Sequence, residues 1–117
     1  MKFIERIPQK EVLDLKKLIP FGEEQIISKT LVQRSSMGMT LFSLDKNQEI
    51  ATHRSNGDAM VNILSGTALI KIADETYTVT AGESIVMPAT IPHSLFAVES
   101  FQMLLVVVKP ENKGERK

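Results

Sequence analysis

Short apolar runs separated by polar turns make up most of this chain from residue 25 onward. Several of the runs are rich in residues that favour β-strands, or alternate sides with the period of two that a strand imposes. No stretch has a convincing long helical period. The pattern therefore predicts strands at 25–32, 37–44, 49–53, 59–65, 67–72, 76–80, 84–87, 94–97 and 101–108.

Turn residues fall between these runs at intervals of about 8–12 residues, a spacing typical of all-β sandwiches and barrels. Asp45–Gln48 is predicted to form a hairpin turn, Asn56-Gly57 a second turn, and Asp74-Glu75 a third. The sequence shows no internal repeat of fixed period. We therefore expect one all-β domain, a barrel spanning residues 25–109.

The two ends of the chain differ from this pattern. Within residues 1–24, the stretch 12–19 lies between two prolines and fits one face of a helix as well as one face of a strand. We expect an extended or single-turn segment that packs on the outside of the barrel or on a dimer partner. Residues 110–117 are mostly charged, and we expect a mobile tail there.

Alternation within predicted strand 59–65 assigns its two faces. If His53 faces the interior, Ala59, Val61 and Ile63 share that side, and Met60 faces outward with Asn62 and Leu64.

Residues 101–108 are apolar on both sides of the last strand, and one barrel cannot bury both faces alone. We therefore expect a homodimer. The alternative is that residues 1–24 fold back and cover the outward apolar positions.

Composition excludes several classes of protein. The chain has 117 residues, 14 basic and 14 acidic, so it lacks the basic excess of a nucleic-acid binder. It contains no cysteine, which excludes disulfides and thiolate metal sites and fits a reducing compartment. The first residues lack the apolar core of a signal peptide, and no apolar run approaches the length of a membrane span. We expect a cytoplasmic protein with no membrane partner.

The chain has only two histidines, and both lie at strand ends. His53 ends one predicted strand. His93 follows Pro88 and Pro92, which restrict the backbone that leads to it. We expect the two imidazoles to face each other across the interior of the barrel.

Two motifs around these histidines resemble those of the cupin superfamily, whose members are small barrels of the jelly-roll type. The first family motif, Gly-x5-His-x-His-x3,4-Glu-x6-Gly, matches at Asn47, His53, Ser55, Ala59 and Gly66. The second, Gly-x5-Pro-x-Gly-x2-His-x3-Asn, matches at Gly82, Pro88, Thr90, His93 and Ala97. The resemblance implies a cupin-type jelly-roll β-barrel, also called a double-stranded β-helix.

The departures from these motifs bear on metal binding. Metal-binding cupins hold a first-row transition metal with three histidines and one glutamate. Here His53 and His93 match, but Ser55 is a poor ligand and Ala59 has no ligand atom. The resemblance therefore implies no certain cofactor, and at most a weakly held divalent metal (Zn, Ni, Mn or Fe) on the two histidines. Asp58, one residue from the glutamate position, should point elsewhere on a regular strand, and a bulge at Asn56-Gly57 could bring it to the site.

Two functions remain open from the sequence, beside a purely structural, hydrogen-bonded role for the histidines. In the first, His53, Ser55, Ala59 and His93 line a pocket that binds a small polar molecule. In the second, the resemblance implies an oxygenase or isomerase whose weakly held metal sits on the two histidines. Imidazole titrates near neutral pH, so the pair could also act as acid, base or donor without a metal. No catalytic residue is assigned.

Overall fold

The computed structural model describes residues 2–111, so most of the tail expected at 110–117 lies outside the described residues. The described chain has one short 3-10 helix and nine strands. Their bounds are η1 Leu15–Leu18, β1 Ile26–Gln33, β2 Met37–Leu44, β3 Glu49–His53, β4 Asp58–Ser65, β5 Thr67–Ile72, β6 Glu75–Thr80, β7 Ser84–Met87, β8 His93–Ala97 and β9 Phe101–Val108.

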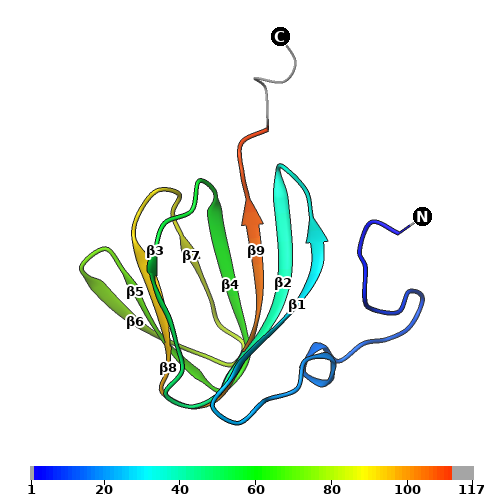
Figure 1. Ribbon diagram of the computed structural model, residues 1–117, viewed down its shortest axis with the longest axis horizontal. Helices are drawn as coiled ribbons and strands as arrows, with labels where there is room; N and C mark the ends of the chain where they lie inside the picture. The colour runs from blue at the N-terminus through cyan, green and yellow to red at the C-terminus, as the bar shows by residue number, and fades with distance from the viewer. Residues whose placement is uncertain (1, 112–117) are drawn as a thin grey trace.

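The strands form two antiparallel sheets that face each other (Figure 1). One sheet has the order β1-β2-β9-β4-β7, and the other has the order β3-β8-β5-β6. All nine strands expected from the sequence are present, and each boundary lies within one residue of its prediction. The all-β prediction is therefore confirmed, and the two-sheet arrangement fits a jelly roll.

The core lies between the sheets and follows the predicted alternation. In β4, Ala59, Val61 and Ile63 are buried, whereas Met60 on the opposite face is 43% exposed. Inward side chains from both sheets meet in one apolar cluster that includes Phe101. Packing of these two inner faces fixes the distance between the sheets and so determines the space left for a site.

A buried glutamine anchors the segment that precedes β1. The Gln102 side-chain amide donates hydrogen bonds of 2.7 Å to the carbonyl oxygens of Lys16 and Ile19. The Ser43 hydroxyl donates to the carbonyl of Pro20. These bonds hold η1 and the residues after it against the outer face of the five-stranded sheet, where Ile19 is 2% exposed. The expected single-turn segment is present at η1.

This segment covers only part of the outer face. It packs against Leu64 and Leu104, which join a second small apolar cluster. The neighbouring register row runs across β2, β9, β4 and β7 and is apolar at every position. Its members are Met39, Val106, Met60 and Val86, of which the last two are exposed.

The first described residues, 2–13, form an arm that lies beyond β1, at the side of the sheet (Figure 1). The Glu5 amide donates to the Leu31 carbonyl, and the Arg6 guanidinium donates to the Thr30 carbonyl, both at 2.8 Å, which ties this arm to β1. Phe3 is 64% exposed and Val12 is fully exposed, so the arm presents apolar side chains to its surroundings. No helix in the described part of the chain has the length and apolarity needed to cross a bilayer.

Candidate functional site

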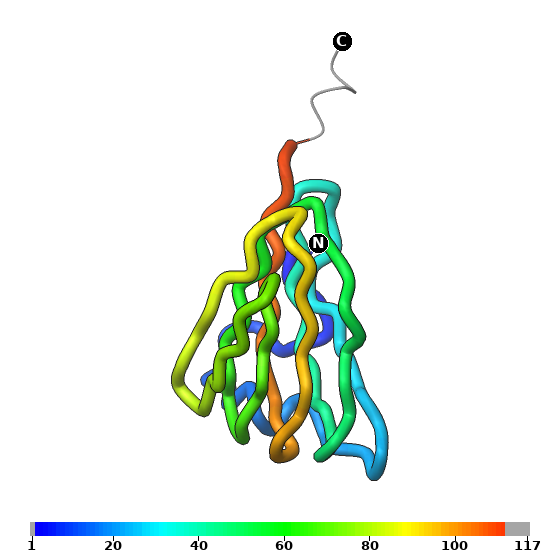
Figure 2. The backbone as a smooth tube through the Cα atoms, turned by 90° about the vertical axis from the view of Figure 1, so that its left-hand side faces the viewer, coloured from blue at the N-terminus to red at the C-terminus, as the bar shows by residue number. Residues whose placement is uncertain are grey.

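Three connections and the end of β9 gather at one end of the two sheets (Figure 2). The connections are residues 34–36, 54–57 and 88–92. A pocket of about 400 Å³ lies between the sheets and reaches this end, with mostly apolar walls. All four residues expected to form the site line this pocket: His53, Ser55, Ala59 and His93.

The two histidines meet as register partners on neighbouring strands. His53 ends β3, His93 begins β8, and the two are paired across that ladder. Their ring centroids are 4.4 Å apart, with the planes at 77°. The prediction that the rings meet is therefore confirmed, but their placement across the interior was wrong, because both belong to the four-stranded sheet. His93 is 2% exposed, whereas His53 is exposed.

The loop before His93 is fastened to its neighbours. The Thr90 amide donates to the Ser55 carbonyl at 2.7 Å, and the Ala73 amide donates to the Pro92 carbonyl at 2.9 Å. Thr90 has a φ of 68°, a left-handed conformation that is costly for a β-branched residue. These contacts fix the approach to His93 on both sides of the loop.

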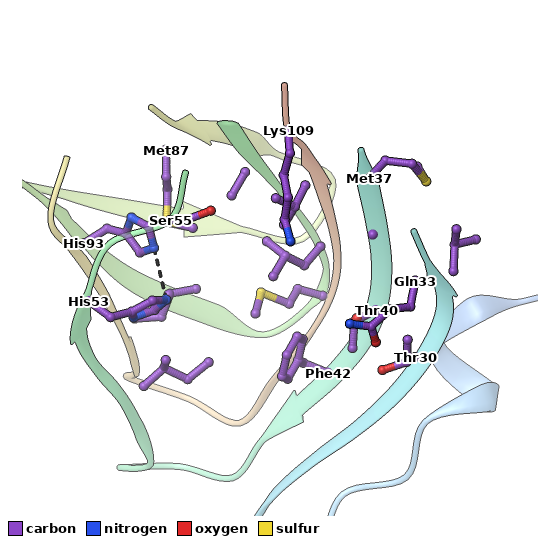
Figure 3. A pocket seen from close by; sticks show the side chains of 18 of the residues that line it. Thr30, Gln33, Met37, Thr40, Phe42, His53, Ser55, Met87, His93 and Lys109 are labelled. Atoms are coloured by element: carbon purple, nitrogen blue, oxygen red, sulfur yellow. Dashed lines mark hydrogen bonds between the residues drawn. The ribbon is translucent and has the colours of Figure 1, made fainter. Parts of the chain in front are cut away.

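The ring nitrogens have a defined geometry. His53 Nδ1 lies 2.9 Å from the Ala51 carbonyl, and His93 Nδ1 lies 3.2 Å from the Ile91 carbonyl. A carbonyl oxygen only accepts, so each Nδ1 carries the proton in these hydrogen bonds. In a neutral ring, Nε2 then presents a lone pair, and the two Nε2 atoms are 3.2 Å apart (Figure 3). A single shared proton, a hydrogen-bond donor or a cation satisfies both lone pairs.

Burial holds the pKa of His93 below its ordinary value of 6.5, and the nearby positive charge of a protonated His53 adds to that effect. The hydrogen bond to the Ile91 carbonyl acts in the opposite direction. A doubly protonated pair would place two positive charges at contact distance within a largely apolar pocket. Beyond the two protons on Nδ1, the site therefore favours at most one further proton, held between the two Nε2 atoms.

The geometry of the pair suits two bonds to one metal ion. Two imidazoles on a tetrahedral metal, each at about 2.0 Å, have nitrogens about 3.3 Å apart, close to the 3.2 Å observed here. The backbone partners on both Nδ1 atoms are those expected behind metal-bound histidine. However, no group of three or more metal-ligating His, Cys, Asp or Glu residues exists within residues 2–111. The described residues supply two neutral metal ligands, which are too few for a complete protein-held metal centre.

The remaining predicted residues do not extend the ligand set. The Ser55 hydroxyl accepts a hydrogen bond from the Gly57 amide at 3.1 Å, and Ala59 contributes a methyl group. Asp58 does not line the pocket, and its carboxylate accepts from the Ala89 amide. Asp58 is therefore not brought into the pocket, and its strand pairs regularly with β9 from Asp58 to Ile63.

Two cationic residues of the pocket were missed in the sequence. Lys109 follows β9 and lines the pocket, as does Arg34 from the connection after β1. The alternation that turns Met103 and Val107 inward also turns residue 109 inward. That signal was present in the sequence, whereas Arg34 could be placed only once the loops were seen together.

Comparisons with known proteins agree with the fold. The cupin domain family model matches residues 40–109. A solved structure of a conserved protein of unknown function from Streptococcus pyogenes is 59% identical, with 95% of this chain and 97% of that chain covered and a TM-score of 0.93. A cupin superfamily protein from Desulfitobacterium hafniense is 26% identical over 92% of this chain and 98% of that chain, with a TM-score of 0.88. Comparison with curated proteins found no match.

The lowered pKa of His93 predicts a pH-dependent stability. Unfolding restores the ordinary value of 6.5, so the unfolded chain binds more protons than the folded chain once the pH falls below that value. The stabilising contribution is complete above about pH 6.5 and declines as the pH is lowered towards the folded-state pKa. Urea unfolding between pH 7.5 and 5.5, with chelator present, should show this decline. His93→Gln should flatten it, and an equal slope in both proteins would contradict the assignment.

Proposed function

Since this chain belongs to the cupin family, we propose that it binds a small molecule with a polar group in the pocket beside His53 and His93. The observation that carries the proposal is the facing pair of Nε2 atoms, which is set in one wall of an otherwise mostly apolar pocket. A pocket of about 400 Å³ lies within the range of small-ligand sites. Membership of the cupin family supports the further proposal that the two sheets form a jelly-roll barrel around this pocket.

The histidine pair supplies the specificity in this proposal. A ligand hydroxyl or amide could donate to one Nε2 and replace the proton shared by the rings. Ser55 lies at the same side of the pocket (Figure 3). Thr40 offers a further hydroxyl from β2. One polar group of the ligand would be recognised by the histidine pair and Ser55, Thr40 on the opposite side would meet another part of it (Figure 3), and its remaining surface would pack on the apolar walls.

A second candidate function is a metal-dependent enzyme with a weakly held divalent metal on His53 and His93. The Nε2 separation of 3.2 Å and the Nδ1 bonds to carbonyls favour it. The incomplete donor set places it behind the binding proposal. We further propose that the protein is cytoplasmic, and its lack of cysteine supports that location.

Filling the pocket should abolish ligand binding. Gly38 lines the pocket, and a Cβ there would meet only the Val32 carbonyl oxygen, at 3.5 Å. Gly38→Leu should therefore fold and occupy ligand space. In a thermal-shift screen of small metabolites, we expect compounds that raise the Tm of the native protein but not of Gly38→Leu. Thr78→Leu, at an exposed position in β6, is the matched control. Equal shifts in native protein and Gly38→Leu would place binding elsewhere.

Restoring the family ligands should create a stronger metal site. The double variant Ser55→His/Ala59→Glu adds one imidazole and one carboxylate at positions that line the pocket. We expect affinity for Zn, Ni, Mn or Fe(II), measured by competition with a chromophoric chelator, to rise by about 100-fold or more. Ser55→His/Ala59→Gln controls for size without the added charge. Unchanged affinity in the folded double variant would show that these positions do not share the site.

We also propose that the chain forms a homodimer through the open part of the outer sheet face. The register row that contains Met60 and Val86, both exposed, lies beside the part of that face that the segment around η1 covers. The arm supplies further exposed apolar side chains, Phe3 and Val12, near the edge strand. A second copy with the same row is a self-complementary partner for such a surface.

Light scattering tests the dimer directly. The chain mass is 13.0 kDa, so we expect about twice that value at micromolar concentration. Met60→Glu should shift the mass towards one chain, because it places a charge in the middle of the apolar row. Thr78→Glu, an exposed change on the other sheet, should leave the dimer intact. A native protein that is monomeric throughout would refute the proposal.

A further inference from the structure

The charged side chains that line the pocket all have the same sign. Among its twenty lining residues, Arg34 and Lys109 are cationic and none is acidic. Two positive groups with no carboxylate in the lining create a positive potential at the pocket. The inward faces of the surrounding strands supply mostly apolar side chains, so a charge directed inward is screened less than a charge on the surface.

Lys109 is held in position by its backbone. Its amide donates to the Ser36 carbonyl at 2.8 Å. Gly57 leaves the space through which the lysine passes, because a Cβ at residue 57 would lie 2.8 Å from Lys109 Cγ and would overlap the Val108 carbonyl oxygen. The side chain is half-buried, and its amino group points into the cavity (Figure 3).

The nearest acidic residue in the strand register does not neutralise this lysine. Asp58 pairs with Val108 in the β4–β9 ladder, so their side chains share the face opposite to the inward positions that flank them. The Asp58 carboxylate instead accepts a hydrogen bond from the Ala89 amide. The ammonium group of Lys109 is therefore directed into the pocket without an acidic partner from the pocket lining.

Arg34 lies at the rim of the same pocket and is exposed. Its guanidinium carbon lies 5.6 Å from the centre of the Phe3 ring, within the range of a cation–π contact. The arm thereby orients Arg34, and the pocket has one cation directed inward and a second at its rim.

We propose that the ligand of this pocket is a small organic anion with an apolar body, whose carboxylate pairs with Lys109 and, at the rim, with Arg34. The proposal rests on the binding function above and specifies its ligand class. The apolar body lies against side chains of both sheets, among them Phe42, Leu95, Met103 and Leu105. A hydroxyl or amide elsewhere on the ligand then reaches the histidine pair, which explains a pocket that is cationic at one side and imidazole-lined at another.

Comparing the affinity of a carboxylate with that of its neutral amide separates the effect of charge from the effect of shape. We would measure the affinities of benzoate, benzamide, hexanoate and hexanamide by isothermal titration calorimetry. We expect each carboxylate to bind the native protein about tenfold or more tightly than its amide, as a charge-assisted contact provides. Lys109→Met should weaken carboxylate binding by a similar factor and leave amide binding unchanged. Lys46→Met removes the same charge from an exposed turn outside the pocket and should have no effect.

The outcomes distinguish this inference from the function on which it rests. If amides bind as tightly as carboxylates and Lys109→Met does not change carboxylate affinity, the anion proposal is overturned and only a small-molecule pocket remains. Binding of carboxylates that persists in Gly38→Leu would show that they associate outside the pocket, which would overturn both. Lys109→Gln, which retains polarity, provides a second variant if Lys109→Met fails to fold. Loss of carboxylate affinity in Lys109→Gln alone still supports the proposal.

Discussion

The contact between His53 and His93 is the constraint on which the site depends. Each ring is oriented locally, by the carbonyl two residues before it, so that Nδ1 donates to the backbone and Nε2 is free. Pairing of β3 with β8 then brings the two Nε2 atoms to 3.2 Å. Two lone pairs at this distance repel unless something lies between them. The folded chain thus keeps an electron-rich position that a proton, a donor group or a cation can occupy.

The surroundings decide which of these occupants is favoured. Family members that hold a metal complete the ligand set with a third imidazole and a carboxylate, and this chain has Ser55 and Ala59 instead. The remaining charges are positive, at Lys109 and Arg34. A pocket of this kind repels a free cation and attracts an anion. The positive charges and the incomplete ligand set both support the proposed organic anion over a bare metal ion.

Much of the fold followed from local pattern, because side chains alternate along strands and turn residues mark their ends. The inward assignment of Val61 and the outward one of Met60 are both confirmed. The adjacency of β3 and β8 was not predictable in this way, since their pairing joins residues 40 positions apart. The histidines were therefore expected on opposite walls. Lys109 was within reach of the same alternation, but it lies one residue beyond the last predicted strand, 101–108, and the alternation was not extended to it.

Ring nitrogen chemical shifts of His53 and His93, measured by long-range ¹H–¹⁵N NMR across a pH titration with chelator present, test the account most directly. We predict that both rings are protonated at Nδ1 and that one proton is shared between the Nε2 atoms before a second proton is taken up at lower pH. Two rings protonated at Nε2 in their neutral form would contradict the central claim.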